Sequence, residues 1–186
     1  MILPLFRRGR RDDSIDRLYG AIVAQARLPM FYANYDVPDS VEGRLDMIML
    51  HIVILLHRLN GESEALSALG QAVFDRFCQD MDDNLREMGV GDLAVPKQMQ
   101  RIAGAFYGRA RAYRVALAAA EPDLLVETVH RNIYQGKAAA EPQARRLASY
   151  VRDVVAHLQE LGEADLAAGR LSYPEPAGAV AAATEL

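Results

Sequence analysis

The sequence predicts an all-α protein: a single-domain bundle of about six helices, followed by a partly disordered C-terminal tail. Alanine and leucine dominate an apolar fraction of 51%, and both residues favour helix over strand. Apolar residues recur at spacings of three and four rather than two, which is the helical period. A chain of 186 residues is long enough for one domain with a substantial core and short for two.

The first two helices are expected on either side of a loop. Residues 13–28 carry one apolar stripe, begin at aspartate or serine caps and end before a proline. Residues 29–38, rich in Pro, Tyr and Asn, then predict the loop. The second helix should begin near Asp39 or Ser40 and end at Gly61. It is apolar nearly all round, with His51 as the polar exception in its middle, so it should be the central helix of the bundle.

Four further helices complete the expected body. Residues 63–88 have a stripe spaced by threes and fours that is broken by glycines, and a proline at residue 96 opens a helix over 96–119. Two more helices follow over 122–134 and 142–161. The chain therefore divides into a basic N-terminal arm (residues 1–12), a helical domain (13–161) and an Ala/Pro-rich, partly disordered tail (162–186).

Charge is distributed unevenly along the chain. The net charge of −4 gives no general attraction for nucleic acid, so DNA is not an expected partner. Residues 93–120 contain no acid and hold a group of cations: Lys97, Arg101, Arg109, Arg111 and Arg114. An acidic stretch over residues 75–92 precedes them, and antiparallel packing of the two helices would pair several of these charges. The alternative is that the cations and their interleaved aromatics form a binding face for RNA or anionic lipid.

The N-terminal arm combines apolar side chains with a cluster of arginines. We expect it to contact an anionic membrane surface weakly, at about 1 kcal/mol per basic residue, or else to be a frayed, solvated terminus. The membrane-contact candidates are Leu5, Phe6, Arg7, Arg8, Arg10 and Arg11. The apolar run precedes the charges, unlike a secretory signal, and no stretch is apolar enough to predict a membrane span. We therefore expect a cytoplasmic protein, with peripheral association at the inner face of the cytoplasmic membrane left open.

Sequence motifs for catalysis are missing, so the sequence predicts a protein that is not an enzyme and has no cofactor. Phosphate loops, dinucleotide fingerprints and nucleophile elbows do not occur. Glu127 and His130 have the spacing of a di-iron ligand pair, but the chain holds no second such pair, so a metal is not expected. The lone cysteine, Cys78, lies in an apolar register and predicts an inert, buried thiol.

Two further features leave alternatives open. His51 is interpreted as a core histidine bonded to a buried carbonyl, with the alternative that it lines a partner groove or senses pH. Gly104 and Gly108 form a small-xxx-small pattern that allows another helix to approach closely, for which tight packing inside the bundle is the ordinary explanation.

One run of residues resembles a known family. Residues 77–92 read FCQDMDDNLREMGVGD and are similar to the signature of the bacterial ubiquinol–cytochrome c chaperone family. Val95-Pro-Lys97, Ala105-Phe-Tyr-Gly-Arg109 and Ala112-Tyr113 follow in the order that the family shows, and the apolar helix with His51 resembles its histidine-bearing helix. The resemblance covers roughly residues 13–160.

The resemblance implies an all-helical chaperone with no catalytic residue. Mitochondrial members of the family bind newly made cytochrome b, promote its assembly into complex III, work with a small helical partner and associate with the ribosome. We therefore expect an assembly chaperone for apo-cytochrome b, with a general helical adaptor at the membrane or ribosome surface as the alternative. The partner-binding candidates, whose aromatic members could equally be core, are Phe74, Phe77, Lys97, Arg101, Phe106, Tyr107, Arg109, Arg111, Tyr113 and Arg114.

Overall fold

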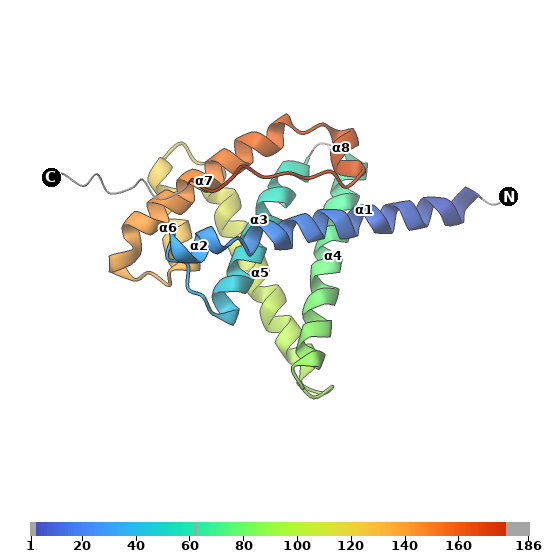
Figure 1. The fold of residues 1–186 in the computed structure, drawn as a ribbon, viewed down its shortest axis with the longest axis horizontal. Coiled ribbons are helices and arrows are strands. Elements are labelled where there is room, and N and C mark those ends of the chain that lie inside the picture. The colour runs from blue at the N-terminus through green and yellow to red at the C-terminus, as the bar shows by residue number, and fades with distance from the viewer. Residues whose placement is uncertain (1–2, 62, 178–186) are drawn as a thin grey trace.

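The computed structural model describes residues 3–61 and 63–177, with side chains described from residue 13 onward. All regular structure in this part of the chain is helical, which confirms the predicted fold class. The helices are α1 (Leu3–Ala26), α2 (Pro29–Ala33), α3 (Val41–Leu59), α4 (Glu64–Glu87), α5 (Val95–Ala118), α6 (Pro122–Ile133), α7 (Glu141–Glu160) and α8 (Glu163–Ala167), with a 3-10 turn at Ala138–Ala140. Figure 1 shows their arrangement.

Helix α3 is the central element, as predicted. It contacts α1, α4, α5, α6 and α7, and every residue from 47 to 55 is buried. The side chain of Ser40 caps its first turn by accepting from the Gly43 backbone N–H at 3.1 Å. Gly43 is required there, because a Cβ at this position would lie 2.0 Å from the carbonyl oxygen of Pro38. Ser40 and Gly43 therefore fix the point at which the chain enters its core helix.

The structure differs from the expected elements near the N-terminus. Helix α1 begins at Leu3 rather than near residue 13, so the backbone of the predicted arm is continuous with the first helix and extends beyond the body (Figure 1). The predicted loop over residues 29–38 contains α2, which opens with Pro29 and buries Phe31. Five residues are too few to show a helical period, and for that reason the pattern did not indicate α2.

Part of the predicted tail packs against the body. Helix α8 buries Leu166, and the segment that follows it runs back along α1 and α7 (Figure 1). Its backbone carbonyls at Ala168 and Ala177 accept hydrogen bonds from Arg17 on α1 and Arg146 on α7, at 3.0 and 2.7 Å. Residues 178–186, the rest of that predicted tail, lie outside the described residues.

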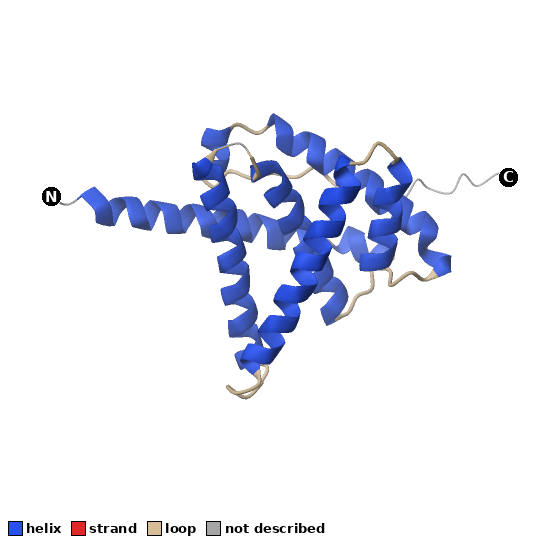
Figure 2. Cartoon of the chain, turned by 180° about the vertical axis from the view of Figure 1, so that it is seen from behind, coloured by secondary structure: helices blue, strands red, loops and turns tan. Residues whose placement is uncertain are grey.

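Helices α4 and α5 form a hairpin that projects from the body (Figures 1 and 2). The turn that joins them is exposed: the side chain of Leu93 is 98% accessible and that of Met88 is 63% accessible. Closer to the body, α4 packs on α1 and α3, while α5 packs on α3 and α6. The hairpin thus carries its two long helices partly out of the core, which exposes much of α5.

Candidate functional site

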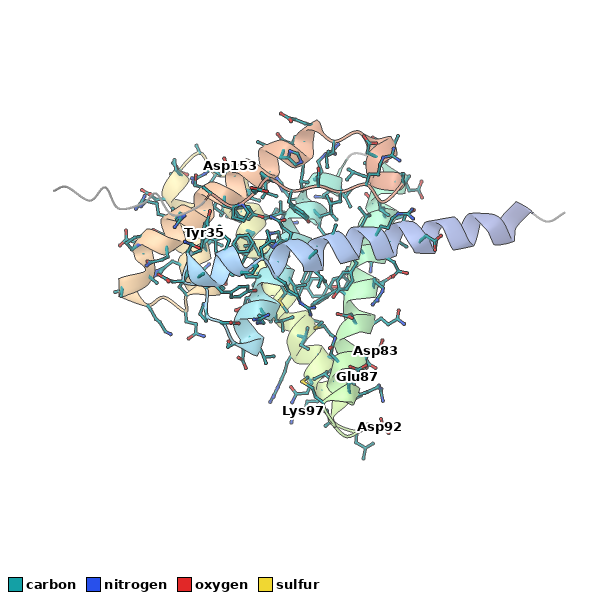
Figure 3. All side chains as sticks on the ribbon, in the orientation of Figure 1. Tyr35, Asp83, Glu87, Asp92, Lys97 and Asp153 are labelled. Carbon is teal, nitrogen blue, oxygen red and sulfur yellow. The ribbon has the colours of Figure 1, made fainter. Side chains whose placement is uncertain are left out.

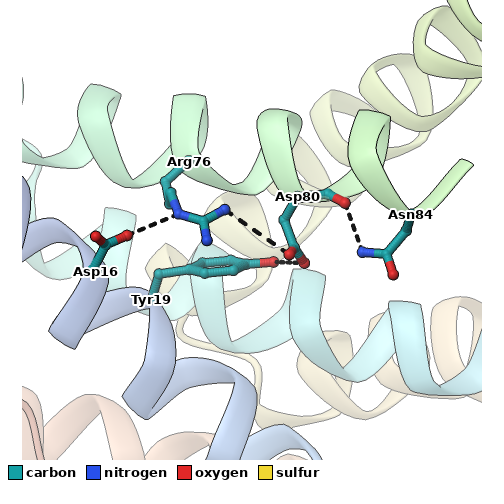
Figure 4. Close-up of polar contacts among 5 residues, drawn as sticks. All are labelled: Asp16, Tyr19, Arg76, Asp80 and Asn84. Atoms are coloured by element: carbon teal, nitrogen blue, oxygen red, sulfur yellow. Dashed lines mark hydrogen bonds and ion pairs between the residues drawn. The ribbon is translucent and has the colours of Figure 1, made fainter. Parts of the chain in front are cut away.

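Helix α4 makes polar contacts with α1 and within itself through Arg76, Asp80 and Asn84. Tyr19 of α1 donates to Asp80 at 2.8 Å, and Arg76 pairs with Asp16 of α1 at 2.8 Å (Figure 4). Asn84 donates its amide N–H to the backbone carbonyl of Asp80 at 2.6 Å. These contacts fasten α1 to the proximal part of the hairpin.

The predicted ion pairing between α4 and α5 is wrong for the described residues, because no α5 cation lies within 4 Å of an α4 carboxylate there. Arg86, the basic residue near the end of α4, instead pairs with Asp82 and with Asp92 in the turn, at 2.6 and 2.5 Å. The physical reason is orientation: the acidic face of α4 is turned to α1, the turn and solvent.

Arg109 is the α5 cation that the fold neutralises. Its guanidinium donates to Asp46 of α3 at 2.6 Å, and the Asp46 side chain is only 13% exposed. Burial raises the pKa of Asp46 to about 6, against the attraction of Arg109, which lowers it. Arg109 therefore ties α5 to α3, and its guanidinium is already engaged by a carboxylate of the same fold.

The other cations of the predicted binding face are free of such pairs. Within the described ranges, no carboxylate lies within 4 Å of Lys97, Arg101, Arg111 or Arg114. All of them are exposed on α5. Lys97 lies near the hairpin turn, in the same part of the molecule as Glu87 and Asp92 (Figure 3). Arg111 and Arg114 lie at the opposite end of α5, where the helix meets the body.

A solvent-open cleft of about 390 Å³ lies where α3, α4 and α5 meet. We name it the α3–α5 cleft. Its apolar lining comes from the C-terminal half of α3, the N-terminal half of α4 and the middle of α5: Val53, Leu56, Leu59, Gly70, Phe74, Phe106, Tyr107 and Ala110. Its polar lining includes His57, Asn60, Ser67, Gln71, Arg111 and Arg114. The unpaired arginines of α5 therefore border an apolar hollow.

Aromatic rings form one wall of the cleft. The Phe74 ring centroid lies 4.7 Å from that of Phe106 and 5.5 Å from that of Tyr107. Phe106 is 2% exposed and supports the wall from behind, whereas Tyr107 is 61% exposed and stands at the opening. The two other predicted aromatics, Phe77 and Tyr113, are buried in the core at 0% and 1% exposure, so the fold withholds them from a partner.

The sequence did not indicate the α3 side of the cleft. Leu56 and Leu59 line it, although the sequence predicted only that α3 is the central helix. Gly70 allows α4 to lie close to them, since a Cβ at this position would be 3.0 Å from the Leu56 side chain. The available signal was the apolar circumference of α3, which exceeds what neighbouring helices cover at its C-terminal end.

His51 lies outside the cleft and belongs to the core, which confirms its interpretation as a buried histidine. It is 0% exposed; its Nδ1 is 2.8 Å from the Met47 carbonyl oxygen, and its Nε2 is 2.9 Å from the Tyr150 hydroxyl. Burial lowers the pKa of His51 to about 4, against the carbonyl contact, which raises it. The neutral ring therefore donates from Nδ1 to the carbonyl and accepts from Tyr150. The rings of Phe31 and Tyr173 pack edge-on to the His51 ring, with centroid distances of 5.7 and 5.3 Å.

Other predicted features have ordinary surroundings. Cys78 is half-buried, and burial raises the pKa of its thiol, which disfavours a nucleophilic thiolate. His130 contacts the Lys137 carbonyl at 2.7 Å through Nε2. The described residues hold no cluster of three or more His, Cys, Asp or Glu side chains with metal-binding geometry. The membrane-contact candidates Leu5, Phe6, Arg7, Arg8, Arg10 and Arg11 lie outside the residues whose side chains are described.

The described residues thus form an open apolar hollow with an exposed aromatic, and with arginines that have no carboxylate partner, at its edge. Within the described part of the chain, no helix combines the length and apolarity needed to cross a bilayer. Residues 33–173 match the family model described as ubiquinol-cytochrome C chaperone, and the chain belongs to this family.

Two known proteins place the chain more closely. Its fold is similar to that of the Cbp3 homolog from Brucella abortus, whose crystal structure superposes with a TM-score of 0.84 at 44% identity, over 94% of this chain and 97% of that one. The mouse protein "Ubiquinol-cytochrome c reductase complex assembly factor 1" is 21% identical over 150 residues, which is 81% of this chain. The match covers 50% of the mouse protein, so the chain spans about half the length of that relative.

Proposed function

We propose that this protein is a non-enzymatic assembly chaperone that binds apo-cytochrome b before it joins ubiquinol–cytochrome c reductase (complex III). The observation that carries the proposal is the α3–α5 cleft in a chain of the ubiquinol-cytochrome C chaperone family. The name of the mouse relative, an assembly factor of the same reductase complex, supports the choice of client.

The cleft has the properties that such a client requires. A membrane protein that has not yet been assembled exposes apolar helices, and burying their surface yields roughly 25 cal/mol per Å². Ordering of the client and desolvation of polar groups offset much of this gain, so binding stays reversible. Arg111 and Arg114 at the edge add orientation and on-rate more than affinity. The client can therefore be held and later released.

Affinity purification from native membranes tests the proposal directly. The tagged protein should retain cytochrome b, and Tyr107→Ser should reduce the retained amount at least about fivefold, because Tyr107 is the exposed aromatic of the cleft. Val41→Ser is the matched control, since Val41 is 70% exposed and does not line the cleft. Absence of cytochrome b from the wild-type purification would contradict the proposal.

Deletion of the gene tests the same function in the cell. Cytochrome b and complex III activity should fall while the other respiratory complexes keep their activity, because the proposed client belongs to complex III. Normal complex III activity in the deletion strain would contradict the assignment.

The projecting part of α1 supports a membrane-associated site of action. Its helical backbone carries the sequence Leu5-Phe6-Arg7-Arg8 and two further arginines beyond the body (Figure 1). We propose that this segment holds the protein weakly at the inner face of the cytoplasmic membrane, where the client is made. Replacing the arginines of residues 7–11 by glutamine should abolish sedimentation with anionic liposomes, and unchanged sedimentation would contradict this role.

A second candidate function, a general helical adaptor at the membrane or ribosome surface, is favoured by Lys97 and Arg101. These two cations have no carboxylate within 4 Å in the described ranges and lie on α5 between the cleft and the exposed turn. Lys97→Gln with Arg101→Gln should then release the protein from ribosomes. Ribosome sedimentation that this pair of changes does not alter would remove the candidate.

A further inference from the structure

We propose that the α3–α5 cleft takes an amphipathic helix that crosses α5 over Gly104 and Gly108 and pairs its own carboxylates with Arg111 and Arg114. This inference rests on the proposed function and deepens it, because it states which part of a client the cleft selects. The cleft carries the argument, and the exposed glycines and unpaired arginines fix the shape and charge of the occupant.

The outer face of α5 beside the cleft carries exposed residues that border Tyr107. Tyr107 lines the cleft and is adjacent on the helix surface to Gly104, three residues earlier, and to Arg111, four residues later. Gly108 lies four residues after Gly104 and three before Arg111, so it borders both of these neighbours of Tyr107. All of these positions are exposed. A partner seated against Tyr107 therefore also meets the two glycines.

The glycines lie against open space. A Cβ at either Gly104 or Gly108 would have no atom within 4 Å outside its own helix, so packing inside the bundle does not explain them. This outcome contradicts the expectation of tight internal packing. Glycine in the middle of an exposed helix is unfavourable by itself, and paired at this spacing it allows another helix backbone to come close. A helix is therefore the occupant that uses this surface.

The unpaired arginines beside the cleft indicate that the occupant carries acidic side chains. Arg111 and Arg114 border the cleft, and neither has a carboxylate within 4 Å in the described ranges. The acids of α4 are turned away from them, toward α1 and the turn. Carboxylates on the occupant can satisfy both guanidiniums in an apolar surrounding, where charge-assisted hydrogen bonds are strong. A basic occupant would place like charges together at the same place, which is costly.

Fluorescence anisotropy with designed peptides tests the inference. The probe is a labelled amphipathic helix of about 20 residues with leucine and alanine on one face, glutamine on the other and a pair of glutamates at one end. A second peptide carries lysines in place of the glutamates. The intact protein should bind the glutamate peptide at least about tenfold more tightly than the lysine peptide.

Two sets of variants assign the effect to the cleft. Arg111→Gln with Arg114→Gln should reduce the preference for the glutamate peptide over the lysine peptide to less than about twofold. The control is Arg27→Gln with Lys137→Gln, which changes the net charge by the same amount away from the cleft and should retain the preference. Gly108→Leu should weaken binding of the glutamate peptide at least about fivefold. Gly20→Leu is its matched control, because Gly20 is also exposed in a helix with no atom within 4 Å of a Cβ.

Each outcome decides the inference. Equal binding of the two peptides would overturn it while leaving the chaperone role intact, because cytochrome b capture can still depend on Tyr107. Weak binding of both peptides, together with capture that depends on Tyr107, would also overturn it. A concentration-dependent dimer that Gly108→Leu dissociates would assign the face to a second copy instead, and binding of an RNA oligonucleotide that is lost in Arg111→Gln with Arg114→Gln would assign it to RNA.

Discussion

Helices α3 and α5 are neighbours in the bundle but differ in how much of their surface is buried. Helix α3 has 19 residues and buries every position from 47 to 55. Helix α5 has 24 residues, of which Val95, Phe106, Tyr113 and Ala116 are buried. The first helix uses its apolar surface to hold the bundle together, whereas the second leaves an aromatic, two glycines and several cations in solvent.

From this difference we expect that stability and binding depend on different parts of this fold. Helix α3 contacts α1, α4, α5, α6 and α7, so a change among its buried residues is felt throughout the bundle. The exposed face of α5 contributes little to the core, and its features are unfavourable or neutral for folding by themselves. Changes on that face should therefore alter binding with little loss of stability.

The largest expected contrast is between Leu50→Ala on α3 and Tyr107→Ala on α5. Leu50 is 1% exposed, so its truncation leaves a cavity and should lower the free energy of unfolding by about 2–5 kcal/mol. Tyr107 is 61% exposed, and its truncation should cost less than about 1 kcal/mol. Urea unfolding followed by circular dichroism measures both, and losses of equal size would break the comparison.

Protonation of His51 in the core of α3 should have the next largest effect on the free energy of unfolding. Because burial lowers the pKa of His51 to about 4 from an ordinary 6.5, the unfolded chain binds a proton between these values that the folded chain does not. The contribution of the neutral His51 ring to stability is complete above pH 6.5 and is lost as the pH drops toward 4. The free energy of unfolding should be lower by about 2 kcal/mol at pH 5.

Asp46 titrates with the opposite sign and must be separated from His51. Its pKa is raised from 3.8 to about 6, so the folded chain binds the extra proton and stability rises as the pH falls between these values. Urea unfolding of the wild type, His51→Leu and Asp46→Asn over this pH range isolates each contribution. An unchanged pH slope in His51→Leu would contradict the account of the buried histidine.

Glycine replacement on α5 sharpens the comparison in the other direction. Gly104→Ala and Gly108→Ala should each raise the free energy of unfolding by roughly 0.5–1 kcal/mol, because alanine favours the helix and its Cβ meets open space. Gly20→Ala on α1 should give a similar gain and serves as the control. Thermal unfolding measures the shift, and a loss of stability at Gly104 would show that a contact is made there.

The smallest effect is expected at the edge of the cleft. Arg111→Gln with Arg114→Gln should change the free energy of unfolding by less than about 0.5 kcal/mol, since the described structure gives neither residue an ion pair. Arg109→Gln should cost more, because it leaves the carboxylate of Asp46 buried without its partner. Equal stability of the double variant and Arg109→Gln would contradict this division among the α5 arginines.

The fold could be predicted from sequence where a pattern was long enough. The apolar circumference of α3 predicted its central place, and the six long helices were predicted because each shows several turns of helical period. Helices α2 and α8 have five residues each, less than two turns, and so carry no periodic signal. They are held by tertiary contacts, such as the burial of Phe31 and Leu166, that the local sequence does not record.

The site could be predicted only in part, because its face depends on rotation of α5. Phe106 and Tyr107 are adjacent in sequence, yet one is 2% and the other 61% exposed. The charge partner of Arg109 is Asp46, 63 residues earlier on α3, and not the nearby acids of α4. Spacing along one helix identifies which side chains share a face, but not which face the rest of the chain covers.

Complementation of a deletion strain tests the central claim most directly, that the α3–α5 cleft acts by binding and not by stabilising the fold. The strain should regain normal complex III content with the wild type or with Arg27→Gln plus Lys137→Gln. With Arg111→Gln plus Arg114→Gln, complex III content should stay low although the variant protein accumulates and unfolds at the wild-type temperature. Normal complex III content with this cleft variant would contradict the account.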